Sequence, residues 1–147
     1  DHAQIAAVNG MMDYMHAVAD RHGSGGKPVQ DQAATVRTLF RDHETELLQP
    51  LLDYLSHHPK IRMIGRNLAV DRAPTVAFTV EGQSSAALAE RLAQAKLGVG
   101  VGNFYAYRLV KALGIDVDDG VVRVSFVHYT SKAEVDRLIK TLDEMLA

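Results

Sequence analysis

Arg123 is the residue whose type and position most invite chemistry, because it stands in the middle of a valine-rich segment. Val122, Val124 and Phe126 alternate with Arg123 and Ser125, a period that is typical of a β-strand with two unlike faces. Two interpretations remain open on the residues alone. Arg123 is either an edge-strand cation that faces water or a surface carboxylate, or a guanidinium fork that binds a ligand carboxylate through paired hydrogen bonds.

The glycine-rich segment Leu97-Gly-Val-Gly-Val-Gly-Asn-Phe-Tyr-Ala106 is the second candidate. The dinucleotide-binding fingerprint requires a strand before it and a third glycine three residues after the second. Here a helical pattern precedes and the spacing is G-x-G-x-G. We therefore predict a strand-to-helix turn in which the backbone approaches a neighbour, rather than a phosphate-binding loop.

Metal and thiol chemistry are not favoured by this composition. The chain has no cysteine, which excludes disulfides and thiolate catalysis. Its seven histidines are scattered without a His-Glu-x-x-His motif, so we predict no metal site. Asp116, Asp118 and Asp119 do not match a calcium-binding loop and are predicted to form a solvated turn.

The bulk properties are those of an ordinary folded domain, with 147 residues of which 47% are hydrophobic. The net charge of −2 gives no basic surface, so nucleic acid is not an expected partner. No apolar run approaches the ~20 residues that span a bilayer, and no signal peptide is recognisable, so we expect no membrane association. The absence of cysteine favours a cytoplasmic protein. Because the chain starts with Asp1 rather than Met, we expect it to be a piece of a longer protein.

The elements that must position Arg123 follow from hydrophobic periodicity. Residues 2–21 and 30–57 are predicted helices, and Pro50 predicts a kink or a split in the second. Residues 61–65 and 74–80 are predicted strands, and residues 84–96 and 107–113 are predicted helices. The strand that contains Arg123 leads into a last helix, which Ser131 and Glu134 begin as a capping box.

This order predicts an α/β (α+β) fold with two layers. We expect a small, mostly antiparallel sheet of about three or four strands, covered by helices on one face. The two N-terminal helices are expected to be appended to this body. The predicted organisation is a helical segment, residues 1–58, followed by a small α/β domain, residues 59–147.

Gly102-Asn-Phe-Tyr-Ala106, Val121-Val-Arg-Val-Ser-Phe-Val-His-Tyr-Thr130 and Glu134-Val-Asp-Arg-Leu138 together resemble the C-terminal part of class V aminotransferases. The similarity is to the cysteine desulfurase-like group of these pyridoxal phosphate (PLP) enzymes. Residues 1–15 also resemble the helix that follows the Thr-Pro-Asn loop of that family. The resemblance therefore runs from one end of the chain to the other.

The resemblance implies the C-terminal (small) domain of a fold type I PLP enzyme, with PLP as the cofactor of the full-length parent and a homodimer as its assembly. In that family the large domain holds the Schiff-base lysine, and no Ser-x-His-Lys-like segment is present here. The chain is therefore expected to hold no catalytic or cofactor-binding residue and to be inactive alone. By the same resemblance, Arg123 binds the carboxylate of an amino-acid substrate, and a loop with Asn103 and Tyr105 lies over the active site.

One departure from the family pattern affects the reaction. The desulfurases of this group carry a nucleophilic cysteine in a Gly-His-His-Cys-Ala pattern, and Tyr105 stands at that position here; Gly100 replaces the arginine that is usual two residues before the first glycine. A phenol cannot take up sulfur as a persulfide, because that chemistry needs a thiolate. Transferase and lyase reactions, namely aminotransfer, β-elimination, epimerisation and desulfuration, all remain open. An alternative from another class is a free-standing α/β binding or interaction module without catalysis.

Overall fold

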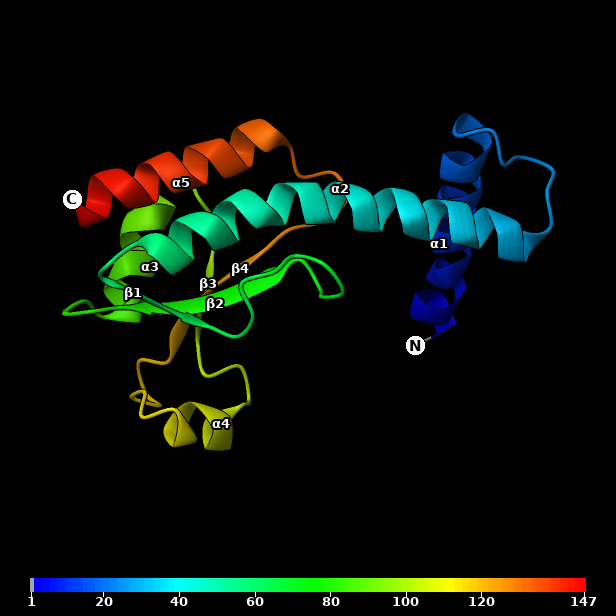
Figure 1. Ribbon diagram of the computed structural model, residues 1–147. Coiled ribbons are helices and arrows are strands. Elements are labelled where there is room, and N and C mark those ends of the chain that lie inside the picture. The colour runs from blue at the N-terminus through cyan, green and yellow to red at the C-terminus, as the bar shows by residue number, and fades with distance from the viewer. Residues whose placement is uncertain (1) are drawn as a thin grey trace. The chain divides into compact units, whose positions relative to one another are not determined.

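The computed structural model describes residues 2–147. Its elements, in chain order, are α1 (His2–Arg21), α2 (Val29–His57), β1 (Ile61–Ile64), β2 (Thr75–Val80), α3 (Ser85–Gln94), β3 (Gly100–Gly102), α4 (Tyr107–Ala112), β4 (Val121–Ser125) and α5 (Lys132–Leu146) (Figure 1). The chain divides into two compact units, the first ending at His43 and the second beginning at Glu44. No helix in the described part of the chain has both the length and the hydropathy needed to cross a bilayer.

The second unit is built on a four-stranded sheet with the order β1-β2-β4-β3, in which every neighbouring pair is antiparallel. The strand β4 is therefore central, with β2 on one side and β3 on the other. The register places Arg123 opposite Ala77 of β2 and opposite Gly100 of β3. Arg123 is thus flanked by two small residues within the sheet, and the interpretation of Arg123 as an edge-strand cation is wrong.

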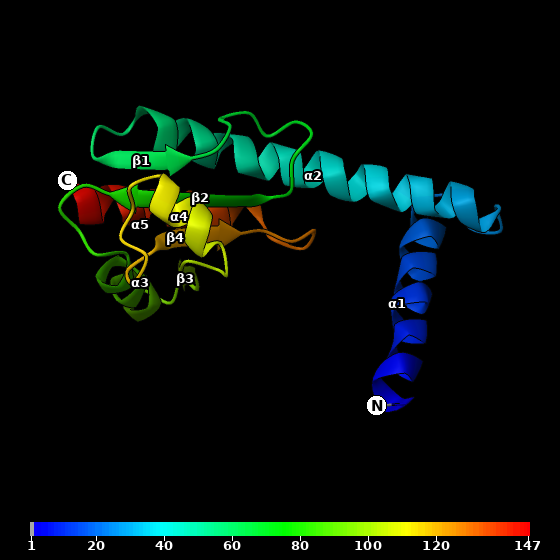
Figure 2. The same ribbon diagram turned by 90° about the horizontal axis from the view of Figure 1, so that it is seen from below.

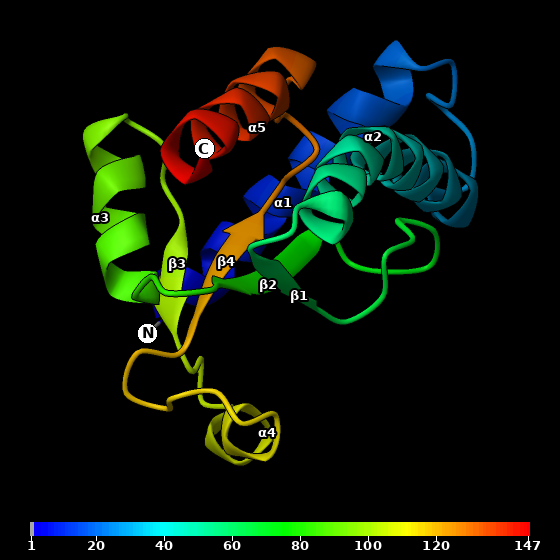
Figure 3. The ribbon, with the colours of Figure 1, turned by 60° about the vertical axis from the view of Figure 1, so that its left-hand side comes forward.

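Helices cover one face of this sheet, as the sequence predicted. The C-terminal half of α2 lies with α3 and α5 over that face, and α4 lies on the opposite side (Figures 1 and 3). Seen from below, α4 stands in front of the strands (Figure 2). Val122, Val124 and Phe78 belong to the core between the sheet and the helices. We call the other face, which carries Arg123, the open face.

The helix α2 runs unbroken from Val29 to His57 with Pro50 inside it, so the predicted split does not occur. Proline removes one backbone hydrogen bond and costs about 3 kcal/mol in a helix interior. Leu48 before Pro50, and Leu51 and Leu52 after it, are each at most 1% exposed. Because burying one leucine contributes about 1.5–3 kcal/mol, packing on both sides of Pro50 offsets its cost. The same burial places this half of α2 in the body of the second unit, which begins at Glu44 rather than at the expected residue 59.

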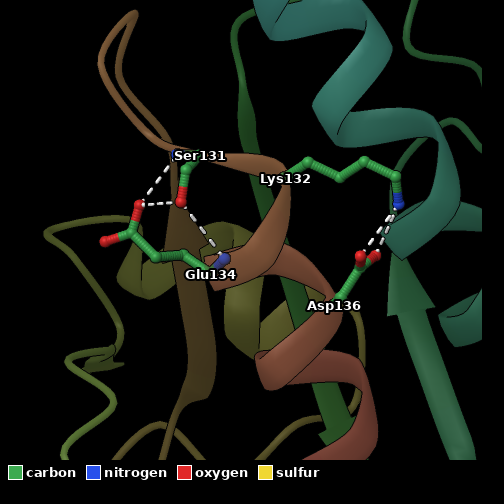
Figure 4. A network of polar contacts seen from close by, with 4 residues as sticks. All are labelled: Ser131, Lys132, Glu134 and Asp136. Atoms are coloured by element: carbon green, nitrogen blue, oxygen red, sulfur yellow. Dashed lines mark hydrogen bonds and ion pairs between the residues drawn. The ribbon is translucent and has the colours of Figure 1, made fainter.

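The last helix begins with the predicted capping box (Figure 4). The Glu134 backbone N–H donates to the Ser131 hydroxyl at 3.3 Å, and the Ser131 backbone N–H donates to the Glu134 carboxylate at 2.7 Å. Hydrogen bonds from the Ser131 backbone and hydroxyl lower the pKa of Glu134. One turn further, Lys132 and Asp136 form an exposed ion pair at 2.9 Å. This cap fixes where the chain leaves the sheet after β4.

In the first unit, the predicted apolar stripe of α1 is mostly exposed. Ile5, Val8 and Met12 have 72%, 53% and 44% of their surface exposed. The unit is held by the fully buried Ala19 and Val36 and by polar contacts to the start of α2, such as the bond of 2.7 Å between His16 Nδ1 and Gln32 Oε1. The outward apolar residues of α1 are therefore free to pack on something else.

Candidate functional site

Arg123 is half-buried on the open face of the sheet and carries an unbalanced charge. Its Nε is enclosed and has no hydrogen-bond acceptor within residues 2–147. None of the ion pairs found in that part of the chain includes Arg123. Its close neighbour is the ring of Phe104, whose centroid lies 3.8 Å from the guanidinium carbon. Among residues 2–147 the recorded partner of this half-buried cation is an aromatic face, so its two Nη groups still have hydrogen bonds to give to an anion.

Gly100 makes this arrangement possible. A Cβ at Gly100 would lie 2.9 Å from the Phe104 ring and 3.7 Å from Arg123 Nε. The first distance is shorter than side chains tolerate, so any other residue at this position would push the ring away. The glycine in β3 therefore creates the space in which the Phe104 ring lies over Arg123.

The loop after β3 is fixed by Asn103. The Asn103 side-chain amide donates to the Val117 carbonyl at 3.1 Å, and its oxygen accepts from the Tyr105 backbone N–H at 3.1 Å. Phe104 and Tyr105 both have left-handed backbones, with φ of 49° and 62°. Such a conformation is uncommon for residues other than glycine and is kept only where the surroundings enforce it. Asn103 supplies that constraint.

The three predicted site residues therefore differ in their surroundings. Arg123 lies under Phe104, the Asn103 side chain holds its own loop, and the Tyr105 side chain is fully exposed to solvent. The aromatic residue on Arg123 is Phe104, which the sequence analysis did not single out. The register that pairs Gly100 with Arg123 leaves room there for a third side chain, and no short sequence pattern specifies that register.

The turn before β4 is bound to the start of α3 through Asp119. Asp119 accepts hydrogen bonds from the Ser84 hydroxyl at 2.6 Å and from the backbone N–H groups of Ser85 at 2.7 Å and Ala86 at 3.1 Å. Burial acts to raise the pKa of Asp119, but these bonds outweigh it and lower that pKa. The prediction of a solvated turn is therefore wrong for Asp119, which caps the start of α3.

The close backbone approach predicted for the glycine segment is confirmed at Gly102. A Cβ on Gly120 would overlap the backbone of Gly102, and Gly120 has a left-handed φ of 67°. The end of β3 therefore lies in direct contact with Gly120, the residue that precedes β4. Together with Asn103, this contact ties the loop that carries Phe104 to the strand that carries Arg123.

The open face is only partly enclosed. Arg62 of β1 donates to the Leu113 carbonyl at 2.8 Å and so holds the end of α4 near this face. A hollow of about 190 Å³ lies beside the end of β4, between Ser125, Val99 and Arg137, and Arg123 does not line it. The arrangement can bind one face of an anionic ligand, and further walls must come from elsewhere.

Several lysines of this chain are engaged within the fold. A resident cofactor would need a free lysine amine together with groups for the pyridine nitrogen and the phosphate. Lys60 instead donates to the Leu146 carbonyl at 2.5 Å, and Lys132 pairs with Asp136. Within residues 2–147, no three His, Cys, Asp or Glu side chains gather as metal ligands would. Lys60 and Lys132 are therefore not the free amines that a PLP Schiff base requires.

A protein-family model and the sequences of related proteins both match this chain. The model of the family Aminotransferase class-V matches residues 35–138. Over 110 residues the chain is 44% identical to the aminotransferase-like protein FGM3 of Gibberella zeae, which covers 71% of this chain and 27% of that protein. Over 108 residues it is 36% identical to the cysteine desulfurase-like protein ustD of Aspergillus flavus, covering 70% of this chain and 25% of that protein. The chain spans about a quarter of the length of these two relatives.

Solved structures agree at the level of the fold. The apo cysteine desulfurase from Thermococcus onnurineus superposes with a TM-score of 0.69 at 24% identity, covering 80% of this chain and 28% of that one. The cysteine desulfurase CsdA from Escherichia coli gives a TM-score of 0.61 at 24% identity, covering 84% of this chain and 33% of that one. At this level of identity the two structures establish a shared fold and nothing finer.

Proposed function

The chain belongs to the aminotransferase class-V family, and we propose that it serves as the C-terminal (small) domain of a PLP-dependent enzyme that acts on an amino acid. In this proposal PLP and its lysine belong to the remainder of the parent protein. When bound, PLP supplies an electron sink for negative charge on the substrate. The residues of this chain bind and orient that substrate and are not competent alone.

The observation that carries the proposal is the guanidinium of Arg123, which is half-buried on a central strand without a hydrogen-bond acceptor. Because Nε is enclosed, the two Nη groups are the donors left for a ligand, and a carboxylate is the anion that matches their paired geometry. A substrate held this way has its α-carbon at a fixed distance from a rigid strand. Orientation of this kind is a large part of what an enzyme supplies to a reaction.

The loop residues have different roles in this proposal. Asn103 keeps the loop closed against the turn before β4, through its bond to Val117. Tyr105 is exposed and presents its phenol to the ligand or to the remainder of the parent protein. Because this chain offers no thiol, its loop cannot carry a persulfide, and we propose transferase or lyase chemistry without that intermediate.

The parent is proposed to be a cytoplasmic homodimer. The support for assembly is the exposed apolar residues of α1, which include Ile5, Val8 and Met11. Exposed apolar groups of this kind are typical of surfaces that pack on another domain or subunit. Analytical ultracentrifugation of the full-length protein tests this, and a strict monomer at high concentration would contradict it.

The test of the main proposal is the variant Arg123→Ala in the full-length protein, with amino-acid affinity and PLP content measured separately. Loss of charge-assisted hydrogen bonds worth about 1.5–3 kcal/mol predicts a 10- to 100-fold weaker affinity for amino acids, with unchanged PLP content. Arg108→Ala, at an exposed arginine of α4, is the matched control and should change neither. Equal losses of amino acid and PLP in Arg123→Ala would refute the carboxylate role.

A further inference from the structure

We infer that Phe104 is the positioning residue of Arg123, and that Gly100 leaves the space that the Phe104 ring requires. The ring fixes the plane of the guanidinium so that its outer edge, formed by the two Nη groups, is the part offered to a carboxylate. This inference rests on the proposed function of Arg123. It adds a residue at a position to which neither the sequence motif nor the proposed function gives a role.

The Phe104 ring contacts the Arg123 guanidinium directly. The Arg123 guanidinium carbon lies 3.8 Å from the centroid of the Phe104 ring, which is direct stacking distance. An arginine over an aromatic face is attracted by the ring quadrupole, and the attraction grows as water is excluded. Arg123 Nε is enclosed without a hydrogen-bond acceptor among residues 2–147, and a Cβ at Gly100 would lie 3.7 Å from it. The inner edge of the guanidinium is therefore closed to a ligand.

Contacts of the loop backbone hold the Phe104 ring in place. Phe104 and Tyr105 are in the left-handed region in succession, so the loop does not adopt this shape through local preference. Asn103 holds the loop through two side-chain hydrogen bonds, and Gly102 rests on Gly120. Because the loop is constrained on the side of the turn, the Phe104 ring is fixed over Arg123.

Stacking on Phe104 orders the Arg123 side chain before a carboxylate binds. An arginine side chain in solvent samples many rotamers, and ordering it opposes binding of a ligand. A guanidinium that is already stacked has lost this freedom before the ligand arrives. Its two Nη groups then accept a carboxylate side by side, while the ring excludes water from one face. Removing the ring should weaken carboxylate binding about 3- to 10-fold, the range expected for one cation–π contact of this kind.

The experiment uses NMR of the chain, observing the Nε–H signal of Arg123, which is assigned by its loss in Arg123→Lys. In the wild type this signal should be displaced by the ring current of Phe104 and should exchange slowly with water. Phe104→Leu and Gly100→Ala should return it to the ordinary arginine position, and Phe104→Tyr should preserve it. Gly98→Ala is the matched control, because a Cβ there meets nothing within 4 Å, and it should leave the signal unchanged.

Sodium acetate is the carboxylate probe. Acetamide at the same concentration and sodium chloride at the same ionic strength are the controls. We expect acetate alone to shift the Arg123 signal, with an affinity about 3- to 10-fold lower in Phe104→Leu and restored in Phe104→Tyr. Circular dichroism shows that each variant remains folded. If Gly100→Ala does not fold, the comparison of Phe104→Leu with Phe104→Tyr still decides the result.

The outcomes separate the two proposals. An ordinary, rapidly exchanging Arg123 signal in the wild type would overturn the positioning role of Phe104. Equal acetate affinity in the wild type and in Phe104→Leu would overturn that role while leaving Arg123 as the carboxylate ligand. If acetate does not act on Arg123 in the wild type, and Arg123→Ala leaves the amino-acid affinity of the full-length protein unchanged, the proposed function fails as well.

Discussion

Replacing Gly120 with alanine tests the backbone contact on which the site depends. Gly120 has a left-handed φ of 67°, and a Cβ there would overlap the backbone of Gly102. Gly82 offers a matched control, because its φ is 71° and a Cβ there meets nothing within 4 Å. The two substitutions therefore share the cost of the backbone conformation and differ only in the contact with β3.

The magnitude follows from these two terms. A left-handed backbone costs a residue other than glycine about 1–2 kcal/mol, which is the full effect expected for Gly82→Ala. Gly120→Ala must in addition move the end of β3 or the turn, which strains the buried bond of 3.1 Å from the Ser85 hydroxyl to the Gly120 carbonyl. A buried polar group that loses its partner costs about 1–3 kcal/mol. The total destabilisation for Gly120→Ala is then about 2–5 kcal/mol.

Urea unfolding followed by circular dichroism measures both values. The informative quantity is the difference between the two variants, expected to be about 1–3 kcal/mol, because the conformational term cancels. If Gly120→Ala and Gly82→Ala lower the free energy of unfolding equally, the backbone contact carries no stability and the reasoning about the loop fails.

Three further predictions concern the stability of the chain. Asp119→Asn should destabilise the chain by about 1–2 kcal/mol at pH 7. Because the folded-state pKa of Asp119 is lowered, its contribution is present above the unfolded pKa and is lost as the pH falls through the folded value, so urea unfolding at several pH values should show the gap closing in acid. Leu52→Ala should cost about 2–5 kcal/mol, because Leu52 is fully buried. Ile5→Ala on exposed α1 should change the free energy of unfolding by less than about 0.5 kcal/mol, and a large loss there would contradict the exposure of Ile5.

The parts of the fold that could be predicted from the sequence are those specified by local patterns. The alternation around Arg123 identified β4, and the Ser131–Glu134 spacing identified the start of α5, because both signals lie within a few residues of the element that they specify. The split predicted at Pro50 was wrong for the opposite reason. The local effect of Pro50 is to break a helix, and only the leucines that pack on both sides of it, against distant strands, decide otherwise.

The candidate site was less predictable, because its contacts join distant segments. Asp119 looked like a solvated turn residue since its partners, Ser84 and Ser85, lie more than thirty residues earlier in the chain. Phe104 could not be placed on Arg123 without the register of β3 against β4, which no short pattern specifies. The chemistry of Arg123 was inferred through a family resemblance, whereas its immediate environment required the structure.

Gly100 and Phe104 are physically coupled positions. A side chain at residue 100 and a ring at residue 104 compete for the same space above Arg123, since a Cβ at Gly100 would lie 2.9 Å from that ring. A larger residue at position 100 therefore requires the residue at 104 to turn away, and an aromatic residue stacked on the guanidinium requires a glycine at 100. Two positions coupled in this way must be exchanged together. Comparison of Arg123 sites among related proteins should accordingly treat residues 100 and 104 as a pair, because the loop decides how much of the guanidinium a ligand can reach.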